Sequence, residues 1–133
     1  MKTVLFACVH NAGRSQIAAA LFNMMADQGK ARAISAGTNP GPVVHPAVIS
    51  VMKEIGLDIS TVAPQRLTPE LAGTAQYLIT MGCGDQCPVV PGAKRDDWPL
   101  SDPNGKSIDE TRKIRDQIHE RVRQLIAREQ FAP

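Results

Sequence analysis

A cysteine and an arginine stand six positions apart near the start of the chain, in the stretch ACVHNAGRS at residues 7–15. An apolar run precedes Cys8 and a segment of helical spacing follows Arg14, which places both residues around a loop between a strand and a helix. Such a loop aims backbone N–H groups into one concavity, and the helix dipole adds positive potential there. We therefore expect residues 8–14, the oxyanion loop, to bind a tetrahedral oxyanion, with Arg14 completing the site through a bidentate pair of hydrogen bonds.

The same positive field favours the thiolate form of Cys8, which makes this side chain a candidate nucleophile. Ser15 is placed to donate a hydrogen bond to the sulfur, and Asn11 and Gly13 suit a tightly turned backbone because both tolerate left-handed dihedral angles. His10 is expected at the rim of the pocket, without a role in the chemistry. The alternative is that Cys8 is only a small apolar side chain that ends a strand. The residues expected to line the oxyanion are Val9, His10, Asn11, Ala12, Gly13 and Arg14.

A nucleophile in an oxyanion site also needs a proton donor for the leaving oxygen. Asp102 offers one in the stretch SDPNG, which follows the last expected strand and so falls on the same rim as the oxyanion loop. The alternative is ordinary turn chemistry, since Asp-Pro and Asn-Gly are common turn sequences. Asp102 is therefore a candidate general acid.

Two further cysteines, Cys83 and Cys87, lie in the stretch MGCGDQCP at the end of another apolar run. This position places both thiols at the edge of the sheet that carries the oxyanion loop. Two alternatives remain: half of a zinc site completed by His10 or His45, or inert packing.

The segments that must position these residues alternate between apolar runs and helical periodicity. Strands are expected at 3–9, 32–37, 77–82 and around Trp98, and helices after the oxyanion loop, at 46–56, at LTPEL and after the SIDE capping box at 107–110. The alternation predicts an α/β three-layer sandwich, with a four-stranded parallel sheet and helices on both faces, formed by a single domain over residues 1–133.

The helical periodicity also assigns individual side chains to the core. Met24 and Met25 are expected to be buried in the first helix, and Ile55 is expected on the inner face of the second. The closing helix should present four residues on one face: Ile114, Ile118, Val122 and Leu125.

Composition narrows the function classes. Of 133 residues, 43% are hydrophobic and 21% charged, a balance typical of a globular protein rather than a disordered one. A formal net charge of +2 and few aromatic residues (three Phe, one Tyr and one Trp) argue against a nucleic-acid or membrane surface.

No apolar run reaches the ~18 residues of a membrane span, and MKTVLFACV is too short for a signal peptide. We therefore expect a cytoplasmic protein, whose three cysteines serve redox or metal chemistry rather than a static disulfide.

These segments together resemble the low-molecular-weight protein tyrosine phosphatase family, and more closely the arsenate reductases built on the same fold. The similarity runs through CVHNAGRSQ at the oxyanion loop, SAGT at 35–38, ISVMKEIGLDIS at 49–60, ITMGC at 79–83 and DWPLSDPNGKS at 97–107. The resemblance implies that Cys8 is the nucleophile, Arg14 the oxyanion clamp and Ser15 the thiolate partner. It also implies that Asn11 stabilises the loop and that Asp102 is the general acid.

The two branches of this family differ in the fate of the adduct that Cys8 forms with the oxyanion. A phosphatase hydrolyses its phosphocysteine, needs no further cysteine, and usually carries aromatic residues after the Asp-Pro, where this chain has Asn104 and Gly105. A reductase must dispose of two electrons, for which Cys83 and Cys87 provide the thiols. The resemblance therefore favours a relay in which Cys83 attacks Cys8 and Cys87 attacks Cys83, moving a disulfide outwards to an external reductant.

The expected electron donor is thioredoxin, with no tightly bound cofactor and no metal. Relatives with a potassium site carry an acid in the first helix, where this chain reads IAAAL, so no potassium requirement is expected.

Three alternatives remain: a mycothiol- or glutathione-dependent arsenate transferase, a phosphatase acting on small or peptide phosphoesters, or a module that only binds phosphate or carries it on Cys8. The expected ligand is arsenate or a phosphate-like oxyanion, and the chain is expected to be a monomer without nucleic-acid or membrane partners.

Overall fold

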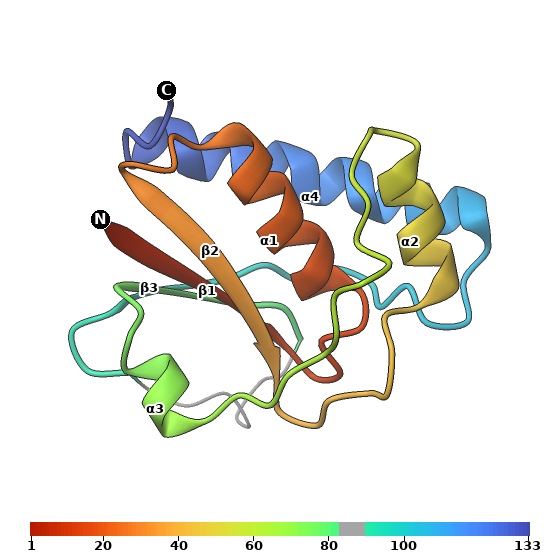
Figure 1. The fold of residues 1–133 in the computed structure, drawn as a ribbon, viewed down its shortest axis with the longest axis horizontal. Coiled ribbons are helices and arrows are strands. Elements are labelled where there is room, and N and C mark those ends of the chain that lie inside the picture. Colours follow the sequence, from red (N-terminus) through yellow and green to blue (C-terminus); the bar gives the residue numbers. More distant parts are fainter. Residues whose placement is uncertain (83–89) are drawn as a thin grey trace.

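Four parallel strands form the centre of the structure, a computed structural model that describes residues 1–82 and 90–133. Their order across the sheet is β2 (Ala31–Gly37), β1 (Lys2–Cys8), β3 (Tyr77–Thr80) and β4 (Lys94–Asp97), so the first strand of the chain lies inside the sheet (Figure 1). All three neighbouring pairs are parallel. The parallel α/β architecture predicted from the alternation of elements is confirmed.

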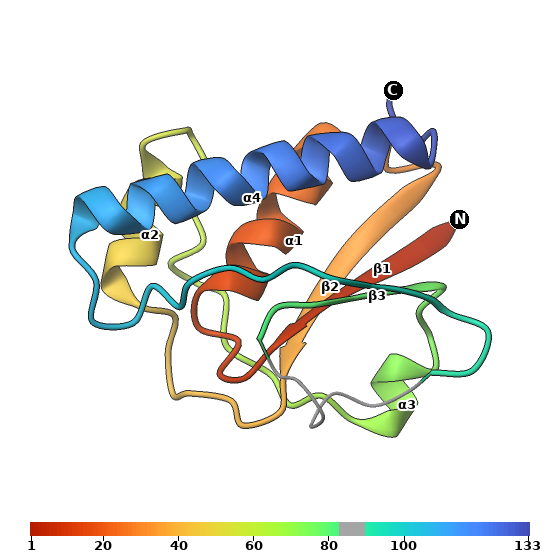
Figure 2. The same cartoon turned by 180° about the vertical axis from the view of Figure 1, so that it is seen from behind.

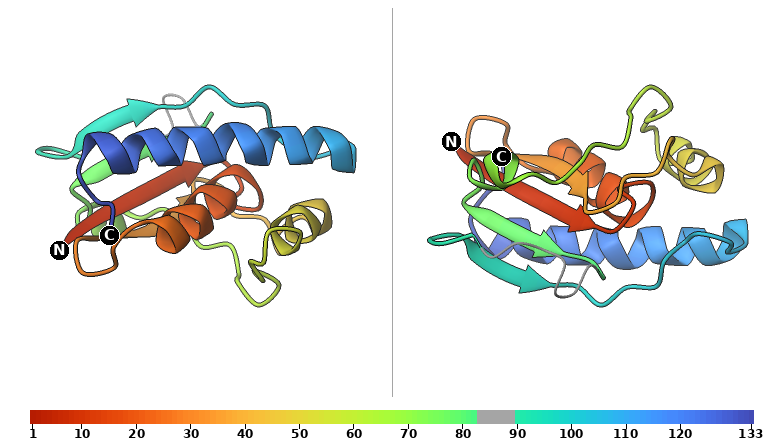
Figure 3. Two further views of the ribbon diagram at one scale, coloured as in Figure 1. Left: turned by 90° about the horizontal axis from the view of Figure 1, so that it is seen from above. Right: turned by 90° about the horizontal axis from the view of Figure 1, so that it is seen from below.

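Strand β1 is buried on both faces, which is why its sequence is a continuous apolar run. Val4 and Phe6 point toward one hydrophobic cluster, and Leu5 and Ala7 toward a second. The first cluster packs against two long helices and the second against a short one: α1 (Arg14–Met25), α4 (Ile108–Arg128) and α3 (Pro69–Ala72). Helices therefore cover both faces of the sheet, as Figure 2 and Figure 3 show.

The closing helix α4 forms as its sequence predicts. Ser107 Oγ accepts a hydrogen bond from the Glu110 N–H at 3.1 Å, and the Glu110 carboxylate accepts one from the Ser107 N–H at 3.4 Å. All four residues expected on its inner face are buried: Ile114, Ile118, Val122 and Leu125. Within the described part of the chain, no helix, α4 included, has the length and apolar character needed to cross a membrane.

Helix α2 (Pro46–Lys53) is shorter than expected. Gly56 adopts a left-handed φ of 84°, and the Leu57 N–H donates to the Met52 carbonyl at 3.0 Å, which turns the chain away from the helix axis. Ile55 is 37% exposed as a result, so its assignment to the inner face is wrong.

Met24 is 48% exposed, contrary to the expectation that it joins Met25 in the core. Leu21, Phe22 and Met25 define the side of α1 that packs against the main hydrophobic cluster. Because adjacent residues in a helix are about 100° apart, Met24 falls on the flank of that face.

The fourth strand ends at Asp97, immediately before Trp98, around which the sequence predicts it. Its residues KRDD are mostly exposed because β4 is an edge strand. Trp98 is itself buried. Its backbone N–H donates to the Thr80 carbonyl at 2.8 Å, and the centre of its ring lies 5.5 Å from that of the Phe6 ring. This packing leads the chain along the carboxyl edge of the sheet toward Asp102.

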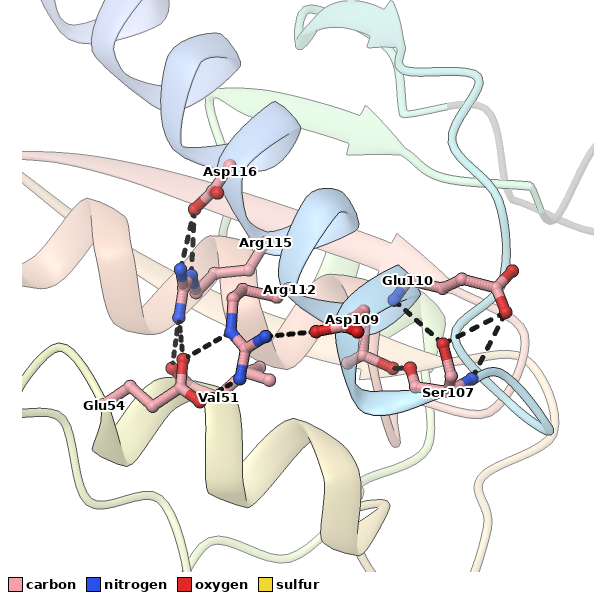
Figure 4. A network of polar contacts seen from close by, with 9 residues as sticks. Val51, Glu54, Ser107, Asp109, Glu110, Arg112, Arg115 and Asp116 are labelled. Atoms are coloured by element: carbon pink, nitrogen blue, oxygen red, sulfur yellow. Dashed lines mark hydrogen bonds and ion pairs between the residues drawn. The ribbon is translucent and has the colours of Figure 1, made fainter.

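Helix α2 is tied to α4 by a group of charged side chains (Figure 4). The Glu54 carboxylate, at the end of α2, accepts hydrogen bonds from Arg112 at 2.7 and 3.0 Å and from Arg115 at 2.8 Å. Arg115 also donates to the Val51 carbonyl at 2.8 Å, and Arg112 pairs with Asp109 on its own helix. The hydrogen bonds from Arg112, followed by those from Arg115, lower the pKa of Glu54 from its usual 4.5 to about 2.

Replacing Glu54 with Gln should lower the thermal midpoint of unfolding at pH 7, because Arg112 and Arg115 lose their shared carboxylate. A pKa that is lowered on folding stabilises the protein above the usual value of 4.5, and this contribution is lost as the pH falls to about 2. The melting curves of wild type and Glu54→Gln, recorded by circular dichroism, should therefore converge between these two pH values. A gap that stays constant across the range would show that the carboxylate charge does not stabilise the contact between α2 and α4.

Candidate oxyanion site

The oxyanion loop lies at the carboxyl end of β1, where ligands bind in parallel α/β folds. Cys8 is the last residue of β1 and is 2% exposed, Gly13 caps α1, and Arg14 is the first residue of that helix. The strand, loop and helix that the sequence predicts around Cys8 and Arg14 are thus present, and the thiol between them is buried.

Every carbonyl oxygen of residues 8–13 accepts a hydrogen bond. The donors are the Thr38 N–H to Cys8 (3.1 Å), Asn39 N–H to Val9 (2.8 Å), Gly41 N–H to His10 (2.9 Å), Gln16 Nε2 to Asn11 (3.1 Å), His45 N–H to Ala12 (2.9 Å) and Ile17 N–H to Gly13 (3.0 Å). Four of the six donors belong to residues 38–45, which we call the scaffold segment. Because these donors engage the carbonyl oxygens, the negative ends of the loop's peptide dipoles are directed away from an anion-binding concavity.

Three N–H groups of the loop are left for a ligand. Within the described residues, no acceptor is found for the N–H groups of His10, Ala12 or Gly13. The start of α1 has no side-chain cap and no acidic residue in its first turn, so no group of the helix itself neutralises the positive end of its dipole. Free donors beside a positive helix end are the features that an oxyanion site requires.

Two polar groups contact the Cys8 sulfur. Ser15 Oγ lies 2.9 Å from Sγ, and the Asn11 N–H donates to Sγ over 3.2 Å. Asn11 has the left-handed backbone that the sequence predicts, with φ at 51°, and its Nδ2 donates to Ser15 Oγ at 2.7 Å. Since Ser15 Oγ accepts that proton, its own hydroxyl proton can point at the sulfur. These are the contacts that a nucleophilic cysteine requires.

Gly13 serves the loop in a different way than expected. Its φ is −143°, so it does not use the left-handed region. A Cβ atom at this position would lie 2.6 Å from Pro103 Cγ and 3.5 Å from the His45 ring. Glycine is needed here because the turn that carries Asp102 approaches the start of α1 closely.

The candidate acid lies beside the candidate clamp. Arg14 Nη2 is 3.8 Å from Asp102 Oδ2, and Arg14 Nη1 donates to the Leu100 carbonyl at 3.0 Å. Asp102 Oδ1 accepts a hydrogen bond from the Asn104 N–H at 2.9 Å, which holds the carboxylate in its turn. The side chain of Arg14 is 8% exposed and that of Asp102 is 43% exposed. Asp102 thus stands at the same edge of the sheet as the oxyanion loop, as its position in the sequence predicts.

Gly82 lies close to the Arg14 guanidinium, a proximity that no sequence pattern indicates. Its φ is 92°, and a Cβ atom there would lie 2.5 Å from Arg14 Nη1. Gly82 immediately precedes Cys83 in the sequence. Cys83 and Cys87 themselves lie outside the described residues, as does the whole stretch 83–89.

The histidines considered as metal ligands lie near the loop. His10 belongs to the loop and His45 stands just before α2, and both are half-buried. Within residues 1–82 and 90–133, no group of three His, Cys, Asp or Glu side chains could hold a metal ion. The zinc alternative also involves Cys83 and Cys87, to which this finding does not extend.

Two contributors to the site are not recognised from motifs: the scaffold segment and Gln16. Weak signals for both exist in the sequence. The run TNPGP at 38–42 directly follows β2, so it must lie at the same edge of the sheet as Cys8. Gln16 is a polar residue directly before the apolar stretch IAAALF of the first helix, where a buried polar side chain needs a partner.

Comparison with known proteins finds relatives along nearly the whole chain. The family model described as low molecular weight phosphotyrosine protein phosphatase matches residues 3–131. The glutaredoxin arsenate reductase of Synechocystis is 37% identical over 131 residues, covering 96% of this chain and 98% of that protein. A solved structure of a Corynebacterium glutamicum thioredoxin-dependent arsenate reductase is 40% identical with a TM-score of 0.84; the match covers 98% of this chain but 62% of that one. An arsenate reductase solved in the phosphate binding state is 35% identical with a TM-score of 0.81, covering 96% of this chain and 98% of that one.

Replacing Gly82 with Ala should weaken the binding of inorganic phosphate by roughly tenfold or more, because the added methyl group displaces the Arg14 guanidinium. Isothermal titration calorimetry measures the change. Gly56→Ala is the matched control: Gly56 has a similar φ of 84°, but an added Cβ meets no atom within 4 Å, so this variant carries the backbone strain alone. Equal phosphate affinity in the two variants would show that Gly82 does not position Arg14.

Proposed function

The chain belongs to the low molecular weight phosphotyrosine protein phosphatase family, and we propose that it is an arsenate reductase that passes oxidation from Cys8 through Cys83 and Cys87 to thioredoxin. The observation that carries the proposal is the oxyanion loop, in which a buried thiol with two hydrogen-bond donors lies beside free N–H groups, Arg14 and Asp102. Relatives described as arsenate reductases, together with the two later cysteines, favour reduction as the reaction at this site.

Arsenate and phosphate share a tetrahedral shape and a negative charge, so one loop accepts either anion. The relative solved in the phosphate binding state supports an oxyanion as the ligand. In this chain the donors for the oxyanion are the N–H groups of His10, Ala12 and Gly13 and the guanidinium of Arg14.

The first step is attack of the Cys8 thiolate on arsenic(V). A sulfur–arsenic bond forms while an arsenic–oxygen bond breaks, and Asp102 supplies the proton with which the leaving oxygen departs as water. Before the attack, the Ser15 hydroxyl and the Asn11 N–H stabilise the charge on the sulfur. Arg14, which lies beside Asp102, balances the negative charge of the remaining oxygens.

Two electrons reach arsenic in the second step. The Cys83 thiolate attacks Cys8 Sγ, a disulfide forms, and the electron pair of the sulfur–arsenic bond leaves with arsenic, which departs as arsenite(III). Cys87 then attacks Cys83, which releases Cys8 as a thiolate and leaves a Cys83–Cys87 disulfide. Cys83 is the proposed first attacking thiol because it directly follows Gly82, the residue that lies beside Arg14.

Thioredoxin is the proposed reductant of that disulfide, because the Corynebacterium relative is described as thioredoxin-dependent and is 40% identical. The name of the Synechocystis relative supports a second candidate, in which glutathione and glutaredoxin supply the electrons. Mycothiol would act in a similar way through an arsenic–thiol adduct. In each case the attack by Cys8 is unchanged and the product is arsenite, so the reaction serves arsenic detoxification.

Phosphatase activity is the alternative that the family description favours. It requires Cys8, Arg14 and Asp102, with water as the second attacking group in place of Cys83. Asn104 and Gly105 follow the Asp-Pro, so this turn has no aromatic side chain to hold a tyrosine ring.

Arsenate-dependent oxidation of NADPH, in the presence of thioredoxin and thioredoxin reductase, is the expected activity of the reduced protein. Cys8→Ser should abolish it because no sulfur–arsenic bond can form. Cys83→Ser should also reduce the coupled turnover to background, because the adduct on Cys8 has no thiol to resolve it. Hydrolysis of p-nitrophenyl phosphate separates the two variants, since it should survive in Cys83→Ser and disappear in Cys8→Ser.

Coupled turnover by Cys83→Ser would contradict the relay. Turnover that requires glutathione and glutaredoxin, or mycothiol, would replace thioredoxin as the donor. Phosphoester hydrolysis without any arsenate reduction would assign the chain to the phosphatase branch, and any arsenate-dependent oxidation of NADPH excludes a module that only binds or carries phosphate.

Replacing Asp102 with Asn should slow adduct formation by roughly a hundredfold to ten-thousandfold, the usual contribution of a general acid. Asn keeps the size of the side chain and an acceptor for the Asn104 N–H, so the affinity for phosphate should not fall. Rapid-quench measurement of arsenite formed in a single turnover gives the rate. An unchanged rate would remove Asp102 from the role of proton donor.

A further inference from the structure

We propose that Gln16 is a positioning residue for the Cys8 thiolate: its side-chain amide sets the orientation of Asn11, which in turn aims the Ser15 hydroxyl at the sulfur. The inference rests on the proposed role of Cys8 as the nucleophile and adds to it a residue that acts through Asn11.

Gln16 is a buried amide in the first turn of α1. It is 4% exposed, and its Nε2 donates to the Asn11 carbonyl at 3.1 Å and to Asn11 Oδ1 at 3.1 Å. One NH2 group therefore holds both the main chain and the side chain of Asn11. Of the six loop carbonyls, that of Asn11 is the one bonded to a side chain, whereas the other five are bonded to backbone N–H groups.

The left-handed backbone of Asn11 gives this hydrogen bond its importance. With φ at 51°, the Asn11 N–H donates to Cys8 Sγ while the carbonyl of the same residue faces Gln16. A left-handed residue other than glycine persists only where its surroundings hold it. The hydrogen bond from Gln16 to the Asn11 carbonyl therefore helps to keep an N–H donor on the sulfur.

The second hydrogen bond from Gln16 decides which end of the Asn11 amide faces Ser15. Asn11 Oδ1 accepts from Gln16 Nε2 and from the Gln65 N–H at 3.0 Å, so the oxygen is directed to these donors. The amide nitrogen is left to donate to Ser15 Oγ at 2.7 Å, and the Ser15 proton is then available for Cys8 Sγ at 2.9 Å. Hydrogen bonds thus run in one direction from Gln16 to the sulfur, and each donor strengthens the next.

Gln16→Met tests this assignment because Met has a similar length but no N–H donor. Asn23→Ala is the matched control, since Asn23 lies on the same helix and its side chain also makes two hydrogen bonds, both with the main chain of Ala33, at 2.8 and 3.0 Å. This control removes two hydrogen bonds of α1 without altering those of Asn11. Both variants should melt below the wild type, and only Gln16→Met should change the reactivity of Cys8.

The readout is the pH dependence of Cys8 alkylation by iodoacetamide in the fully reduced protein, followed by mass spectrometry of the peptide that contains Cys8. At pH 6, Gln16→Met should react about tenfold more slowly than wild type, whereas the limiting rates at high pH should be equal because the thiolate then forms in both. Asn23→Ala should follow the wild-type curve. A Gln16→Met curve that superimposes on the wild type overturns the proposal.

Failure of the proposed function gives a different pattern. If wild-type Cys8 reacts at pH 6 no faster than the thiol of free glutathione, Cys8 is not an activated nucleophile and the function falls together with the inference. If wild-type Cys8 reacts rapidly and Gln16→Met equally rapidly, the inference alone fails.

Should Gln16→Met not fold, the side-chain amide resonances of Gln16 and Asn11 in wild-type protein supply the test by NMR. As the pH is raised, the chemical shifts of these resonances should change with the same midpoint as Cys8 alkylation. Resonances that do not respond to pH overturn the assignment.

Discussion

The oxyanion loop depends on one constraint: a short stretch of backbone must direct its carbonyl oxygens away from a buried anion and keep its N–H groups for that anion. Each peptide unit carries both a donor and an acceptor, so the acceptors need partners of their own. Four of the six partners come from the scaffold segment, one from the first turn of α1 and one from the Gln16 side chain. The site therefore depends on the chain after β2 as much as on the residues between Cys8 and Arg14.

The scaffold segment is anchored at both ends. It begins where β2 pairs with β1 beside Cys8, and it ends at His45, the residue before α2. The far end of α2 is held to α4 through Glu54, which accepts hydrogen bonds from Arg112. Exposed ion pairs ordinarily contribute little to stability, but this one fixes a helix that starts beside the oxyanion loop. Helix α4 thereby supports the loop without supplying any of the residues assigned to the reaction.

The charge of Arg14 sets a second requirement, because a buried guanidinium without partners is costly. The Leu100 carbonyl and the Asp102 carboxylate offset that cost, and Gly82 leaves the space in which the guanidinium lies. The same arrangement keeps the candidate acid beside the candidate clamp. Clamp and acid are therefore positioned together, and Gly13 allows this because it has no Cβ to collide with the Asp-Pro turn.

The sequence by itself determined the elements and the candidate reacting groups, because periodicity, helix caps and the spacing of residues 8–14 are local properties. Asp102 could also be placed from sequence, since parallel strands end at one edge of the sheet. The exposure of Ile55 could not, because backbone hydrogen bonds end α2 before the apolar period does. Tertiary structure alone decided the close approach to Gly13 and the hydrogen bonds of Gln16. Those roles depend on partners, such as the Asp-Pro turn and the Gln65 N–H, that folding brings from distant parts of the chain.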